Sequence, residues 1–273
     1  MTRDQAWRLR ERRVEHLGRD EGGRAIVIGS GKGGVGKSVL SVLIAGVLAR
    51  RGQRVLLVDA AMHLGHLHLL LGVCPALRTH AVITDGVDPE RLMVEVGDGL
   101  WLLPADPGAE EVYRLSVMDR ARLQLRLSEL YDGFDQIVVD ASPGVDGVLR
   151  VGAVGAGSLV VVSVPEPASI SDAYGLIKIA TSQLPRLPVR VIANRVSDDA
   201  EGAQVFARLE LATRRFLRRE LDYLGEVPER GSWAARVRRP GALLEERDPA
   251  IETLVDRLTT VTPAGAAVAE DVS

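Results

Sequence analysis

The feature that most constrains the fold is a glycine-rich loop at residues 29–38, GSGKGGVGKS, between an apolar run and a helix-length segment. The pattern G-x-x-x-x-G-K-[ST] of phosphate loops is matched by Gly31, Gly36, Lys37 and Ser38. Glycines let backbone N–H groups converge on phosphate oxygens, beside the positive end of the following helix. In such loops the lysine reaches the outer phosphates and the serine hydroxyl ligates Mg2+. The sequence therefore predicts a site for the phosphates of a ligand and for Mg2+.

Apolar runs and helix-length segments alternate along most of the chain. The runs lie at 25–30, 54–59, 100–105, 136–140, 158–164 and 189–194, and the helix-length segments at 38–50, 110–131, 170–183 and 202–220. Continuous apolar runs are typical of strands that are buried on both faces. Their alternation with helices predicts an α/β fold, a mostly parallel doubly wound sheet with helices on both faces and a ligand site beyond the carboxyl ends of the strands.

Three segments are expected along the chain of 273 residues. Residues 1–23 form a short charged helix and a polar linker, residues 24–260 form the α/β domain, and residues 261–273 form a disordered tail. Residues 232–260 contain Ile251, Leu254, Val255 and Leu258 at helical spacing, accompanied by Glu252 and Asp256. This pattern favours core-packing and surface helices over a membrane-surface helix, which needs a basic polar face.

Composition excludes several classes of protein. The only cysteine is Cys74, which rules out an intrachain disulfide and a cysteine-ligated cluster built within one chain. No apolar run reaches the roughly 18 residues of a membrane span, and the N-terminus lacks a hydrophobic signal core, so we expect a cytoplasmic protein. A net charge of -3 argues against nucleic-acid binding over the whole surface, and no direct nucleic-acid partner is expected.

Two carboxylates follow apolar runs at the expected phosphate end of the sheet. Asp59 ends VLLVD and Asp140 ends QIVVD. Carboxylate oxygens are preferred ligands of Mg2+, so Asp59, Asp140 and Ser38 are the candidate metal residues. The alternative is that each aspartate caps a neighbouring helix.

A second lysine in the loop, Lys32, gives the form KGGVGKS, and only three lysines occur in the chain: Lys32, Lys37 and Lys178. KGGVGKS is the deviant Walker A form, and the sequence resembles the deviant Walker A ATPases of the MinD/ParA group. The resemblance implies an ATP-bound homodimer in which Lys32 reaches the partner's phosphates and acts catalytically with Lys37 and Asp59. It also implies that Asp140 is the Walker B residue, that Asp59 is the first aspartate of switch I, and that the N–H of Gly144 points toward the γ-phosphate. The implied nucleotide-binding loop comprises Gly31, Lys32, Gly33, Gly34, Val35, Gly36, Lys37, Ser38 and Val39.

Switch I departs from this family. MinD-like sequences usually read D-x-D, whereas this chain has Ala61 where the second aspartate positions the attacking water. Loss of such a group typically lowers the rate by about 10²–10⁴, so we expect ATP binding with strongly reduced turnover. The same stretch contains His63, His66 and His68, for which a switch helix facing solvent or the dimer interface is favoured over a metal site.

The resemblance also implies an adenine pocket. An asparagine in the position of Asn194 contacts adenine in these ATPases, and the stretch at 224–229, LGEVPE, closes over the ring. Asn194, Arg195 and Pro228 are the candidate adenine residues. The alternative for Asn194 is an asparagine that ends a strand in a turn.

Three segments resemble the FlhG family of flagellar-number regulators, also called FleN or YlxH: VPEPASISDAYGLIK at 164–178, LRRELDYLGEVPE at 217–229, and DQAWRLR at 4–10. The last is similar to the D-Q-A-x-x-L-R element that stimulates FlhF, a GTPase of the signal-recognition-particle type. The resemblance implies that this GTPase is contacted by Asp4, Gln5, Ala6, Leu9 and Arg10.

The resemblance implies further partners: flagellar switch proteins, a flagellar transcription factor, and the cytoplasmic face of the inner membrane at the cell pole. The alternatives are a MinD-type division-site ATPase, a ParA-type cargo-positioning ATPase, and a hydrolysis-deficient scaffold that senses ATP.

Overall fold

The computed structural model describes residues 25–60, 65–77, 79–105, 116–144 and 156–260, so the N-terminal element at 4–10, the tail at 261–273, Ala61 and His63 lie outside the described residues. Eight strands form one sheet, in the order β3-β4-β2-β5-β1-β6-β7-β8. They are β1 (Ala25–Gly29), β2 (Val55–Ala60), β3 (Val94–Gly97), β4 (Leu100–Leu103), β5 (Gln136–Ala141), β6 (Ala156–Ser163), β7 (Val189–Val196) and β8 (Asp222–Pro228). All neighbouring strands are parallel except the edge pair β3 and β4. The predicted mostly parallel α/β fold is confirmed.

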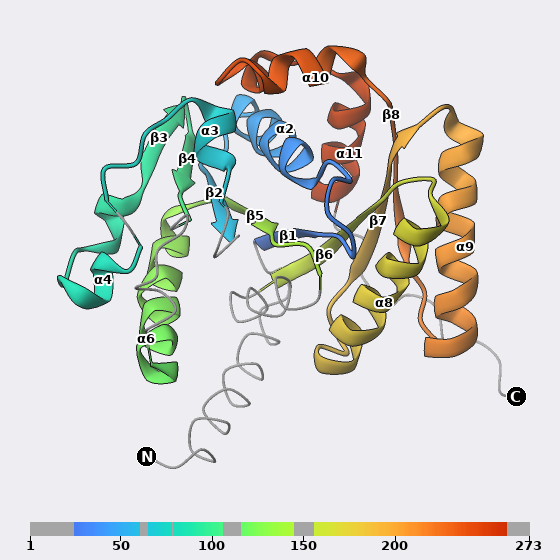
Figure 1. Ribbon diagram of the computed structural model, residues 1–273, viewed down its shortest axis with the longest axis horizontal. Coiled ribbons are helices and arrows are strands. Elements are labelled where there is room, and N and C mark those ends of the chain that lie inside the picture. Colours follow the sequence, from blue (N-terminus) through green and yellow to red (C-terminus); the bar gives the residue numbers. More distant parts are fainter. Residues whose placement is uncertain (1–24, 61–64, 78, 106–115, 145–155, 261–273) are drawn as a thin grey trace, which may run out of the picture.

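Helices cover both faces of the sheet (Figure 1). The α-helices are α2 (Lys37–Arg50), α3 (Leu67–Leu71), α4 (Ala81–Thr84), α6 (Val117–Ser128), α8 (Pro167–Gln183), α9 (Asp199–Leu217), α10 (Gly231–Val237) and α11 (Pro249–Thr259). Short 3-10 helices occur at η1 (Pro89–Leu92), η2 (Glu129–Gly133) and η4 (Ala242–Glu245). One hydrophobic core joins the sheet to α2, α3, α10 and α11, and a second joins its other face to α6, α8 and α9.

Helix α2, with the sequence KSVLSVLIAGVLAR, is apolar on nearly every face. It packs between the sheet and α11. Eleven of its residues are buried, from Lys37 to Ala49. A helix that is hydrophobic on every face is typical of a buried core helix. The helix that begins at the phosphate loop is therefore held rigidly from both sides.

The segment 232–260 is the core-packing region that its pattern indicated. Ile251, Leu254, Val255 and Leu258 of α11 are buried, as is Trp233 of α10. The apolar face of α11 is therefore already committed to the core of the domain. Among the described residues, no helix combines the length and apolar character needed to cross a membrane.

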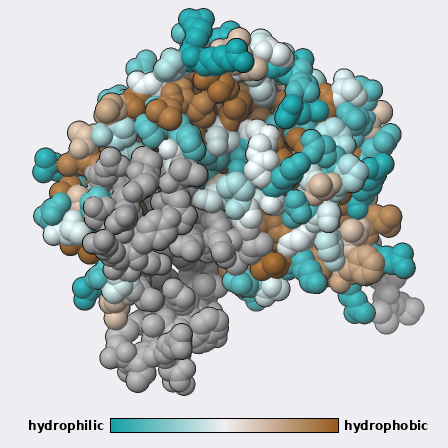
Figure 2. Space-filling view, viewed as in Figure 1, coloured by the Kyte–Doolittle hydropathy of each residue, from teal (hydrophilic) through white to brown (hydrophobic). Residues whose placement is uncertain are grey.

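The surface carries a few large apolar side chains among charged ones. On α9, Leu211 is 69% exposed and Phe216 is 68% exposed. Figure 2 shows hydrophobic surface interrupting the hydrophilic surface on the side of the molecule where α9 lies. The guanidinium of Arg215 lies over the ring of Phe216, 5.4 Å from its centroid.

Candidate functional site

The phosphate loop joins the end of β1 to the start of α2, and its glycines are required by geometry. Gly34 and Gly36 have positive φ, 79° and 90°, which L-residues with side chains rarely adopt. A Cβ on Gly31 would lie 2.2 Å from the backbone of Asp172, and one on Gly36 would lie 2.4 Å from the Asn194 amide nitrogen. The loop therefore packs directly against α8 and the end of β7.

The two predicted metal carboxylates lie side by side. Asp59 at the end of β2 pairs in register with Asp140 at the end of β5, and Asp140 also neighbours Ile28 of β1. Both are buried, with exposed fractions of 6% and 5%. Parallel strands thus bring residues 81 positions apart to the edge of the sheet from which the phosphate loop emerges.

Charges at this edge perturb one another. Burial raises the pKa of Asp140 to about 6, and the Ser38 hydrogen bond and the charge of Lys37 partly oppose this rise. Burial also lowers the pKa of Lys37, against the attraction of Asp140. Because both groups are buried, the charge of an added phosphate or metal ion would change their pKa values strongly.

Asp140 is held by two hydroxyls of α2. Ser38 hydrogen-bonds to its carboxylate. The Oγ of Ser41 lies 3.2 Å from Oδ1 of Asp140 and 3.0 Å from the carbonyl oxygen of Lys37. Sequence reasoning missed Ser41, although a single polar residue inside an apolar helix was a signal available in the sequence.

Asp59 also contacts the start of α3. Its Oδ2 accepts a hydrogen bond from the backbone N–H of Leu67 at 3.1 Å, at the start of α3. A Cβ on Gly65 would lie 2.6 Å from the same oxygen, so the chain approaches this carboxylate closely. His66 precedes α3 and His68 lies within it, and no group of three metal-ligating side chains exists in the described part of the chain.

Lys32 is paired within its own chain. Its Nζ lies 2.7 Å from Oε2 of Glu166, the residue before α8, and both side chains are partly exposed. The Lys32 hydrogen bond lowers the pKa of Glu166. Sequence reasoning did not identify Glu166, which is 134 residues from Lys32. The N–H of Gly144 likewise has a partner in its own chain, the carbonyl oxygen of Ser30 at 2.8 Å.

The candidate adenine residues lie at the ends of β7 and β8. Asn194 is 3% exposed and its amide donates to the carbonyl oxygen of Val35 at 2.7 Å, which ties β7 to the phosphate loop. Its Oδ1 is buried and has no hydrogen-bond partner among the described residues. Arg195 has a positive φ of 58° and pairs with Glu229, 2.7 Å away, while Pro228 pairs in register with Val196. A buried acceptor that lacks a partner beside the loop suits a nucleobase with an amino group, which can donate to it.

The donor set fits Mg2+. The Ser38 hydroxyl and the carboxylates of Asp59 and Asp140 all offer oxygen atoms, and they gather where the phosphate loop meets α2. Mg2+ prefers oxygen ligands and is usually held by one or two carboxylates together with substrate phosphates. The arrangement can therefore bind a nucleotide with its metal.

Comparison with known proteins agrees with this geometry. Residues 26–239 match the family described as the CobQ/CobB/MinD/ParA nucleotide binding domain. The chain is 35% identical over 223 residues to the antiactivator FleN of Pseudomonas aeruginosa. The aligned region covers 81% of this chain and 79% of that protein. It is 32% identical over 229 residues to the flagellum site-determining protein YlxH of Helicobacter pylori, covering 82% and 76%.

A solved structure of similar fold is the cell division ATPase MinD of Pyrococcus furiosus. The TM-score is 0.70 at 23% identity, covering 86% of this chain and 98% of that one, and this likeness shows the fold. The matched family and the two flagellar relatives go further, because they cover most of this chain and of their own length. The chain therefore belongs to the CobQ/CobB/MinD/ParA family of nucleotide-binding domains and, within it, to the group that contains FleN and YlxH.

Proposed function

We propose that this protein is an ATP-dependent, dimerising switch ATPase that controls flagellar number or placement. The observation that carries the proposal is the juxtaposition of the phosphate loop with Asp59 and Asp140 in a chain related to FleN and YlxH. Those relatives are named as an antiactivator and as a flagellum site-determining protein. A nucleotide switch suits such a task, because ATP selects one state of the protein and that state presents a different surface to partners.

Each residue of the site has a task in nucleotide binding. The loop N–H groups and the start of α2 hold phosphate oxygens, and Lys37 neutralises charge on the outer phosphates. Ser38, Asp59 and Asp140 hold Mg2+, which offsets negative charge on the phosphates when bound. Asn194, Arg195 and Pro228 take the adenine. Lys32, released from Glu166, contributes charge to the partner subunit's nucleotide.

Turnover is expected to be slow, because Ala61 has no group that orients or deprotonates water. Replacing it by aspartate, Ala61→Asp, should raise the ATP hydrolysis rate by about 10²-fold or more. Phosphate release under saturating Mg2+ and ATP measures this, with Lys37→Ala as the control that loses nucleotide binding. If Ala61→Asp hydrolyses ATP no faster than the natural chain, the protein acts as a hydrolysis-deficient scaffold that senses ATP.

The N-terminal arm is proposed to contact an FlhF-type GTPase through Asp4, Gln5, Ala6, Leu9 and Arg10. A glutamine suits such a contact, since it can orient water or a phosphate neighbour. Flagellar switch proteins, a flagellar transcription factor and the inner-membrane surface at the cell pole are proposed as further partners of the ATP-bound state.

A synthetic peptide of residues 1–20 should stimulate GTP hydrolysis by the cognate FlhF-type GTPase, and its Gln5→Ala version should not. The GTPase rate with and without each peptide measures this, beside the full chain and a chain lacking residues 1–20. If neither peptide nor full chain stimulates, a MinD-type division-site or ParA-type cargo-positioning role replaces the flagellar one.

A further inference from the structure

We propose that Ser41 is a positioning residue for the metal site: its hydroxyl fixes the Asp140 carboxylate in the orientation that receives Mg2+. This inference rests on the proposed Mg2+–nucleotide site and adds a residue to it. Ser41 lies one helical turn after Lys37 on α2 and is fully buried, with an exposed fraction of 0%. It cannot touch the nucleotide or solvent, so any effect on the site passes through its neighbours.

Two acceptors lie within reach of the single Ser41 hydroxyl hydrogen. Its Oγ is 3.2 Å from Oδ1 of Asp140 and 3.0 Å from the Lys37 carbonyl oxygen. The bond to the carbonyl is a common way for a helical serine to satisfy itself. The contact with Asp140 is different, because it joins α2 to β5 across 99 residues of sequence and reaches a charged group. Hydrogen bonds to charged groups contribute more than neutral ones.

Asp140 needs a donor of this kind. Asp140 is 5% exposed, and the hydroxyls of Ser38 and Ser41 hydrogen-bond to its carboxylate. Ser38 has a second task, since its oxygen ligates Mg2+ in phosphate loops. Ser41 has none. Ser41 is therefore the donor that stays with Oδ1 when the metal enters, which leaves the other carboxylate oxygen for the metal or for one of its waters.

The spacing on α2 supports this division of tasks. Ser38 and Ser41 are three residues apart and so lie on one face of the helix, the face toward β5. The flanking residues of Ser41, Leu40 and Val42, are apolar and buried. In an otherwise apolar stretch an alanine would form the helix better than serine. The hydroxyl thus has a cost in the helix that its contact with Asp140 offsets.

The test separates metal binding from nucleotide binding in the full chain. Affinity for ADP is measured in EDTA, and Mn2+ affinity of the ADP-loaded protein is measured by electron paramagnetic resonance. Loss of a group that orients a metal ligand typically lowers metal affinity 10–100-fold. We therefore expect Ser41→Ala to weaken Mn2+ binding about 10-fold while ADP affinity in EDTA stays within about two-fold.

Matched variants distinguish positioning from packing. Thr213→Val removes another buried helical hydroxyl, which bonds the carbonyl oxygen of Glu210 on α9, and should leave Mn2+ affinity unchanged. Ser41→Cys keeps nearly the same side-chain size, but its thiol donates weakly, so its Mn2+ affinity should also fall. This variant replaces Ser41→Ala in the test if the alanine variant does not fold. In an Asp140→Ala background, which has no side-chain acceptor for the Ser41 hydroxyl, Ser41→Ala should have no further effect on Mn2+ affinity.

Two results would overturn the inference. Mn2+ affinity of Ser41→Ala and Ser41→Cys equal to that of the natural chain would show that Ser41 only packs. An equal loss in the presence and absence of Asp140 would show that its effect does not pass through that carboxylate. Failure of the natural chain to bind ADP at all is a different result, which overturns the proposed function and this inference together.

Discussion

Among single residues, the buried Asp140 couples its ionisation to the stability of the fold. Its folded-state pKa of about 6 lies above the ordinary value of 3.8, chiefly because burial penalises the charge. Between these pH values the folded state holds a proton that the unfolded state has lost, so the free energy of unfolding falls as pH rises from about 4 to about 6. Above that range the metal-free site carries a destabilising negative charge, which a bound cation would offset.

Asp140→Asn is therefore expected to stabilise the nucleotide-free protein. The gain should be roughly 2–3 kcal/mol at pH 7.5 and close to zero at pH 4, since at low pH the natural carboxyl is already neutral. Urea unfolding in EDTA at the two pH values measures it. Asp98→Asn, at an exposed position, is the control and should change stability by less than about 0.5 kcal/mol. Destabilisation by Asp140→Asn at pH 7.5 would contradict this account of the site.

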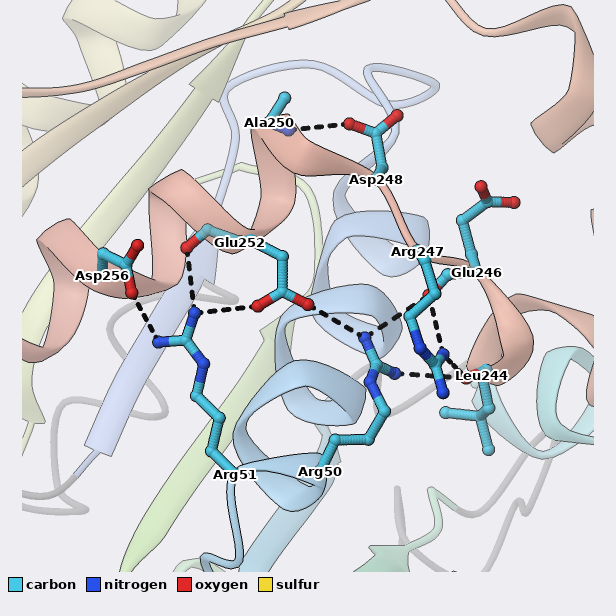
Figure 3. A network of polar contacts seen from close by, with 9 residues as sticks. All are labelled: Arg50, Arg51, Leu244, Glu246, Arg247, Asp248, Ala250, Glu252 and Asp256. Atoms are coloured by element: carbon cyan, nitrogen blue, oxygen red, sulfur yellow. Dashed lines mark hydrogen bonds and ion pairs between the residues drawn. The ribbon is translucent and has the colours of Figure 1, made fainter.

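At the scale of elements, α11 is attached to α2 by two kinds of contact. Arg51, the residue after α2, pairs with Glu252 at 2.8 Å and with Asp256 at 2.7 Å, and Arg50 pairs with Glu252 at 3.5 Å (Figure 3). Glu252 is 39% exposed and Asp256 66%, so solvent screens these pairs. Beneath them, Leu254 and Val255 are buried against the core. We infer that apolar packing holds α11 and that the ion pairs fix its register.

Variants of α11 should separate the two contributions. Leu254→Ala should cost about 2–4 kcal/mol of unfolding free energy, because it removes a side chain that is 1% exposed. Glu252→Gln should cost less than about 1 kcal/mol and lose that effect in 1 M salt. Denaturant unfolding of both variants at low and high salt measures this. A larger loss from Glu252→Gln than from Leu254→Ala would mean that the ion pairs hold the helix.

At the scale of the whole molecule, the sequence predicted the parallel core because its strands are continuous apolar runs. It missed β8, whose sequence DYLGEVP contains the acidic, glycine and proline residues of a loop and becomes a strand by pairing with β7. It also missed β3, a four-residue edge strand with alternating burial. Local pattern carries little information on such strands, because neighbours far along the chain stabilise them.

The candidate site, too, could be predicted only in part. The gathering of Lys37, Ser38, Asp59 and Asp140 at one edge of the sheet could be predicted, because the loop motif and the strand ends fix their places. Their roles toward phosphate and metal stay predictions. Glu166 was not, since its pairing with Lys32 depends on how the chain brings the start of α8 beside the loop. Asn194 was predicted as an adenine contact, and the structure adds that it also ties β7 to Val35.

We propose that ATP switches this chain between monomer and dimer through Lys32, which pairs with Glu166 in the single chain. Sedimentation velocity with Mg2+ and ATP, or with Mg2+ and ADP, tests it directly. We expect a dimer in ATP, a monomer in ADP, and a monomer in both for Lys32→Ala, while Lys178→Ala, at the exposed remaining lysine, behaves as the natural chain. A protein that binds ATP but stays monomeric, or a Lys32→Ala variant that still dimerises, would contradict the claim.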